Sequence, residues 1–138
     1  MFPQIKILNL DTRVKFFFDI PDSLKWYLLT QVMIIVHSKV FEPFGIAVVE
    51  GMFLGAVSVV YKGFLSGPWI DIVDRGKYGF GFRDEVELSN IIENLLNDYN
   101  LWSNFSKKAV LRSDYFSYIN FKRNLIELLA KRGVIGNV

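Results

Sequence analysis

The chain has 138 residues, of which 51% are hydrophobic and 16% aromatic, with a mean hydropathy of +0.27. This composition excludes a disordered chain, and the length predicts a single domain over residues 1–138. The net charge of +2 is too small, and the basic residues too interleaved with acids, for a nucleic-acid-binding protein. A sequence without cysteine has no disulfides or thiolate metal sites, which favours a cytoplasmic protein.

Segment 44–61 is the one candidate for a membrane span. Glu50 lies near its middle and glycines interrupt it, and a carboxylate at the centre of a lone span is costly. We therefore expect no transmembrane helix, and the sequence also predicts no signal peptide. Basic residues gather only near the C-terminus, where we expect the solvated face of amphipathic helices, with an anionic membrane surface or a phosphate-bearing partner as the alternative. They are Lys107, Lys108, Arg112, Lys122, Arg123, Lys131 and Arg132.

The first half of the chain predicts two strands and a short helix. Residues 14–20 are aromatic and β-branched and end at Pro21, so we expect a buried strand. Asp22 or Ser23 then caps a helix to about Thr30. Residues 32–36 form the next strand, apolar on both faces. Continuous apolar strands separated by helices indicate a parallel sheet that is covered on both sides.

The second half continues this alternation. A helix is expected over 45–54 with Gly55 as its left-handed stop, then a strand over 57–61 and a loop over 62–69. One helical turn over 70–73 and a short strand over 78–82 follow. Asp84 and Glu87 form a capping box for the next helix, and helices over about 102–112 and 116–132 complete the chain. The order predicts an α/β fold, a Rossmann-like parallel sheet of about four strands flanked by helices, with C-terminal helices.

Ligands of such sheets bind beyond the carboxyl ends of the strands, where segments 38–45 and 62–69 and the helix from Gly45 converge. The free N–H groups at that helix N-terminus suit a phosphate. Glu42, just ahead of the helix, would repel a phosphate unless it faces another part of the ligand, such as sugar hydroxyls. Glu50 is expensive to bury unless it accepts hydrogen bonds, which the vicinal hydroxyls of a ribose would donate.

Each of these residues also has a purely structural interpretation. A carboxylate before a helix is most often a cap, and a lone glutamate in an apolar helix often meets a lysine. If Glu42 and Glu50 were both paired internally with Lys or Arg, that pairing would speak against a ligand site. His37 is expected to be packed or hydrogen-bonded, because the sequence holds no second histidine to share a metal. We therefore predict no metal site.

An ordered set of motifs resembles the group 1 retaining glycosyltransferases, which have a two-domain Rossmann-like architecture. The set begins with Glu42-Pro43-Phe44-Gly45-Ile46, followed by Glu50 eight positions after Glu42 and by Gly55 before a strand. Segment 66–73, SGPWIDIV, resembles the glycine-rich loop of the family, and segment 76–81, GKYGFG, resembles its next strand entry. The resemblance runs from Val14 onward and identifies the chain as the C-terminal, donor-binding domain.

The resemblance implies a substrate and roles for residues. The substrate is a nucleotide-sugar, and no separate cofactor is needed. Glu50 would hold the ribose, and Glu42, the catalytic candidate, would contact the transferred sugar. The backbone N–H groups of Phe44, Gly45 and Ile46 would bind the sugar and distal phosphate, with Gly67 in the glycine-rich loop. Ile20 and Pro21 would lie near the base. The implied reaction transfers a sugar to an acceptor with retention.

The chain also departs from the family pattern. Nothing before Val14 matches the two strands and the basic residue pair with which the donor domain normally begins, and no acceptor-binding domain precedes them. We therefore expect the isolated chain to need an acceptor domain for transfer. Three explanations of the missing strands stay open: a rearranged sheet, a partner chain that fills the gap, and a truncated gene product. Two alternatives stay open: a non-catalytic nucleotide-sugar-binding subunit, and a remnant whose exposed sheet edge drives homo-oligomer formation.

Overall fold

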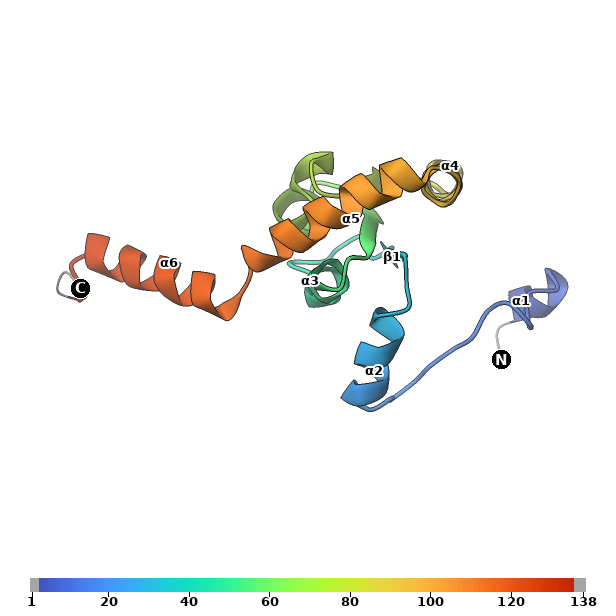
Figure 1. Ribbon diagram of the computed structural model, residues 1–138, viewed down its shortest axis with the longest axis horizontal. Coiled ribbons are helices and arrows are strands. Elements are labelled where there is room, and N and C mark those ends of the chain that lie inside the picture. Colours follow the sequence, from blue (N-terminus) through green and yellow to red (C-terminus); the bar gives the residue numbers. More distant parts are fainter. Residues whose placement is uncertain (1–2, 136–138) are drawn as a thin grey trace.

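The computed structural model describes residues 3–135, which form a small parallel sheet with some helices packed against it and others projecting away from it (Figure 1). The strands are β1 (Ile34–His37), β2 (Val57–Tyr61) and β3 (Phe80–Phe82), in the order β1-β2-β3. Both pairings are parallel, with Ile34 opposite Val57 and Val59 opposite Phe80. The predicted α/β class and the parallel sheet are therefore confirmed.

From residue 22 onward the helices follow the predicted order, whereas the short helix near the N-terminus was not predicted. Their bounds are α1 (Pro3–Ile7), α2 (Asp22–Leu29), α3 (Ile46–Phe53), α4 (Glu85–Asn97), α5 (Tyr99–Asp114) and α6 (Tyr118–Lys131), with a π-helical turn η1 (Pro68–Ile72) and a 3-10 turn η2 (Asp74–Gly76) after β2. Gly55, at φ +88°, follows the end of α3 as expected.

Local capping explains where two of the helices begin. The Asp84 carboxylate accepts a hydrogen bond of 2.8 Å from the Glu87 N–H and so starts α4. The Glu87 carboxylate accepts a hydrogen bond of 2.7 Å from the N–H of Arg83 rather than from that of Asp84. Only one of the two hydrogen bonds of the predicted capping box therefore forms. The predicted cap of α2 is wrong, because Pro21 is its N-cap and no side chain closes it.

Apolar side chains alternate along β2 and fill both faces of the sheet. Val57 and Val59 pack with Phe82 and Leu95 on one face, and Val60 packs on the other face with residues of α3, η1 and α5. Helix α5 contributes to both clusters, through Ala109 on one side and Trp102 on the other. Figure 1 shows α5 lying across the sheet. β2, in which every residue but Tyr61 is buried, is therefore the centre of the core.

The predicted strand over residues 14–20 is wrong, so the sheet has three strands in place of about four. This segment is extended but forms no strand, and Phe17 and Phe18 are 50% and 70% exposed. It runs away from the sheet toward α1 (Figure 1). Strand propensity alone does not make a strand, because the backbone also needs a neighbour to hydrogen-bond with; in the described part of the chain the sheet ends at β1.

The two ends of the described chain lie outside the core. Figure 1 shows α6 projecting from one side of the molecule and α1 from the other. Neither helix contains a buried residue. Within residues 3–135, no helix is both long enough and apolar enough to cross a membrane.

Candidate functional site

Two loops meet at the carboxyl end of the sheet and are joined through their main chains. The first follows β1 and contains Glu42, and the second follows β2 and contains Ser66 and Gly67. The Gly67 N–H donates to the Glu42 carbonyl at 2.7 Å, and the Glu42 N–H donates to the Leu65 carbonyl at 3.3 Å. The segments predicted to converge, 38–45 and 62–69, are therefore in direct contact.

Two glycines permit this close approach. A Cβ atom on Gly67 would lie 2.0 Å from the Pro43 carbonyl oxygen, so no other residue fits without moving the backbone. Gly45 has a φ of +94°, a left-handed conformation that favours glycine. A Cβ atom there would lie 2.7 Å from Cγ of Pro68. The loop contact thus fixes the direction in which α3 begins.

The N-terminus of α3 has N–H groups that are not hydrogen-bonded within the described chain. Gly45 is the N-cap, and no side chain caps the helix. The N–H groups of Gly45, Ile46 and Ala47 have no hydrogen-bond acceptor within residues 3–135, while that of Phe44 makes only a long contact of 3.5 Å with Glu42. These N–H groups and the helix dipole favour an anionic group at this place.

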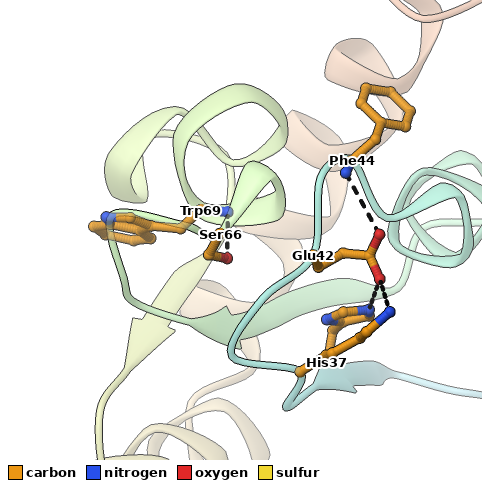
Figure 2. A network of polar contacts seen from close by, with 6 residues as sticks. His37, Glu42, Phe44, Ser66 and Trp69 are labelled. Carbon is orange, nitrogen blue, oxygen red and sulfur yellow. Dashed lines mark hydrogen bonds and ion pairs between the residues drawn. The ribbon is translucent and has the colours of Figure 1, made fainter.

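The Glu42 carboxylate lies among cationic and polar groups at the end of β1. Figure 2 shows it pointing toward the His37 ring, with the Phe44 N–H on its other side. Lys39 Nζ lies 3.1 Å and His37 Nε2 lies 3.7 Å from the same carboxylate oxygen. His37 Nδ1 is buried and has no hydrogen-bond partner in the described chain. His37 therefore packs under Glu42, as the structural interpretation expected, but with one ring nitrogen unsatisfied.

Lys39 holds the pKa of Glu42 below its ordinary value by donating a hydrogen bond to the carboxylate. This stabilisation is present above the pKa of the carboxyl in the unfolded chain and is lost as the pH falls through the lower folded-state pKa. Replacing Lys39 with alanine should raise the pKa of Glu42, as measured by carboxyl carbon NMR during a pH titration. An unchanged pKa in Lys39→Ala would contradict this assignment of the cause.

Glu50 lines a hollow of about 550 Å³ between α2, α3 and α5. Its side chain is 22% exposed, and Lys25 of α2 donates a hydrogen bond of 3.0 Å to it. This bond raises the pKa of Lys25. Phe44 and Ile46 line the same hollow, whereas Glu42, Gly67, Ile20 and Pro21 do not. Three of the predicted site residues, Phe44, Ile46 and Glu50, therefore line one hollow. Glu42 and Gly67 contact each other outside it. Ile20 and Pro21 lie apart from both, at the start of α2.

Both candidate carboxylates have a lysine partner, which is the arrangement expected to speak against a ligand site. The two pairs differ in kind. Lys39 is 64% exposed and lies three residues from Glu42, so their pair is a local surface contact of little energetic value. Lys25 belongs to α2, which contains no buried residue. Neither lysine is therefore held in place by the core, but both candidate carboxylates are paired, and this pairing speaks against a ligand site.

Arg112 of α5 supports the second loop, and the sequence pattern gave no sign of this role. Its guanidinium donates to the carbonyls of Ile72, at 3.0 Å, and Asp71, at 2.6 Å. It also lies over the rings of Tyr78, Tyr115 and Phe116. Arg112 therefore holds the end of η1 against α5. The sequence showed only a basic residue in a basic segment, because contacts between residues 40 positions apart leave no local pattern.

A parallel sheet with two loops and an uncapped helix N-terminus at its carboxyl end is the arrangement in which α/β domains bind phosphate-bearing ligands. Comparison with known families gives the more particular assignment. The family model described as "Glycosyl transferases group 1" matches residues 2–112, and the chain belongs to this family. The predicted resemblance is thus confirmed.

Two relatives from Dictyostelium discoideum are similar over most of the chain. One is "GDP-Man:Man(3)GlcNAc(2)-PP-Dol alpha-1,2-mannosyltransferase", 30% identical over 124 residues, covering 90% of this chain and 24% of the relative. The other is "Alpha-1,3/1,6-mannosyltransferase ALG2", 28% identical over 133 residues, covering 93% of this chain and 30% of the relative. The chain thus spans less than a third of the length of each of these relatives.

Proposed function

We propose that the chain is the nucleotide-sugar-binding half of a retaining glycosyltransferase. One observation carries this proposal: the open N–H groups of Gly45, Ile46 and Ala47 begin α3 directly beside the loop joined to Gly67. In the proposed complex these groups hold the donor phosphates, because they supply both hydrogen bonds and the positive end of the helix dipole. Membership of the group 1 family supports a nucleotide-sugar as the ligand.

Glu50 and Glu42 take different parts of the donor in this proposal. Glu50 lies in the second turn of α3, at the hollow, and accepts the ribose hydroxyls after Lys25 gives up its bond. Glu42 faces the transferred sugar, and the Lys39 ammonium offsets the negative charge of Glu42 near the diphosphate. Catalysis is then mainly electrostatic, since fixed dipoles and charges stabilise the leaving diphosphate and the positive charge that develops on the sugar.

We propose that transfer to an acceptor requires a further, acceptor-binding domain. The donor we favour is GDP-mannose, because one relative is named for that donor and both are named as mannosyltransferases. We place the reaction in the cytoplasm. The alternative function, a non-catalytic nucleotide-sugar-binding subunit, would use the same site. It would bind the donor in the same way but would not transfer the sugar.

Calorimetric titration of the chain with GDP-mannose, and with UDP- and ADP-sugars as the comparison, tests the proposal. We expect saturable binding that prefers one base, with GDP-mannose the tightest. A sample shown to be folded by circular dichroism that binds none of these donors would refute the proposal. That result would favour a self-associating remnant, for which the exposed apolar side chains of segment 14–18 provide a surface.

A further inference from the structure

A second, polar cavity lies on the other side of the loop that carries Gly67. It has a volume of about 280 Å³ and lies between the loop after β2, the turns η1 and η2, and the end of β3. Its walls include three cationic side chains and two aromatic ones: Lys62, Arg75, Arg83, Phe64 and Trp69. None of the predicted donor-site residues lines it. Figure 2 shows the Trp69 ring pointing away from Glu42.

Two of the three cationic side chains of this cavity have no acidic partner in the described chain. The side chains of Arg75 and Arg83 make no hydrogen bond or ion pair with the described residues 3–135. Lys62 alone has an acidic partner, Glu87, at 3.1 Å. The other acids near the cavity have other partners. The Asp84 carboxylate caps α4, and the Asp74 carboxylate lies 3.9 Å from Lys77.

The cavity walls are held in place by the backbone. The Trp69 ring packs against Gly81, where a Cβ atom would lie 2.5 Å from the ring, and it also contacts the position of Gly76. Arg75 lies in a turn in which it and Asp74 both adopt left-handed conformations, with φ of 51° and 49°. Such conformations are unfavourable for residues other than glycine and persist only where the surrounding structure imposes them. The turn therefore directs Arg75 to the cavity.

We propose that this cavity binds a compact phosphate-class anion, of the size of pyrophosphate or a phosphate monoester group. Guanidinium groups match the oxygens of a phosphate through paired hydrogen bonds, and the Lys62 ammonium adds a point charge. The volume lies below the range of sites for drug-sized ligands, which favours a compact anion. The proposal does not depend on donor binding, since the two sites share only the loop between β2 and η1.

Two-dimensional ¹H–¹⁵N NMR with inorganic pyrophosphate tests this assignment residue by residue. The chain has three tryptophans, and we expect a saturable shift of the indole N–H of Trp69 while that of Trp102, which donates to the Met33 carbonyl, stays unchanged. The double variant Arg75→Gln/Arg83→Gln should lower the affinity at this site at least tenfold. The matched control Lys122→Gln/Arg123→Gln on exposed α6 removes the same charge and should leave the affinity unchanged.

Several outcomes would overturn the proposal. They are no saturable Trp69 shift, an equal loss in both double variants, and shifts confined to the amides of Gly45 and Ile46. Glu50→Ala should keep the Trp69 shift, and Arg75→Gln/Arg83→Gln should keep GDP-mannose binding, so failure at one site is distinguishable from failure at the other. Vesicles of phosphatidylcholine with phosphatidic acid, in a parallel sedimentation assay, test a lipid headgroup as the source of the phosphate. If the wild-type chain sediments with these vesicles and Arg75→Gln/Arg83→Gln does not, the ligand of the cavity is the lipid headgroup.

Discussion

Gly67→Ala should lower the free energy of unfolding by about 3 kcal/mol, at the upper end of the cost of overpacking a folded protein. The added Cβ atom would lie 2.0 Å from the Pro43 carbonyl oxygen, and a backbone atom cannot move aside as a side chain can. The two loops must therefore separate, and the bond from the Gly67 N–H to the Glu42 carbonyl must lengthen. Urea denaturation followed by circular dichroism measures the change.

Gly133→Ala is the matched control for this prediction. Gly133 has a φ of +68° and nothing within 4 Å of an added Cβ atom, so alanine there pays only the conformational cost of about 1 kcal/mol. Gly67 has an ordinary helical φ of −56°, so its cost is steric alone. If Gly67→Ala were no more destabilising than Gly133→Ala, the result would contradict the close contact between the two loops at Gly67.

Arg112→Lys should cost about 2–3 kcal/mol of stability, although it keeps the charge. The guanidinium bonds the carbonyls of Asp71 and Ile72 at the same time and lies over three aromatic rings. An ammonium group is a single point donor and cannot reproduce this planar fork. Thermal and urea unfolding of the variant measure the loss, and protection of the η1 amides in hydrogen exchange should fall with it.

The control for Arg112 is Arg123→Lys. Arg123 is exposed on α6 and makes no hydrogen bond or ion pair within the described chain, so its replacement should change stability by less than about 0.5 kcal/mol. Equal stabilities for the two variants would show that Arg112 does not hold η1 against α5. In that case the second loop would depend on its main-chain contacts with Glu42 alone.

The sequence predicted best those elements whose signal is local. The strand over 57–61 formed as expected because five consecutive apolar or small residues follow a glycine stop at Gly55. The helix from Gly45 formed because its apolar residues lie between two left-handed glycines. Segment 14–20 was mispredicted because its composition favours a strand, while strand formation depends on a neighbour that composition cannot reveal.

The candidate site was predictable only in part. Motif spacing placed Glu42, Gly45 and Gly67 at one end of the sheet, and the structure joins them there. Spacing could not reveal that Lys25 would reach Glu50 from α2, since 25 residues separate the two. The cavity around Arg75 and Arg83 was missed for the same reason, because its walls come from four separate segments. The roles of Glu42 and Glu50 toward a donor stay predictions.

The most direct test of the donor site compares Glu50→Ala with Lys25→Ala in calorimetric titration with GDP-mannose. If Glu50 accepts the ribose hydroxyls, Glu50→Ala should weaken binding at least tenfold, while Lys25→Ala frees the carboxylate and should leave the affinity equal or higher. Circular dichroism of both variants shows whether a loss of binding is due to a loss of folding. Equal binding by wild type and Glu50→Ala, or an equal loss in both variants, would show that Glu50 serves only its ion pair and would contradict the proposed site.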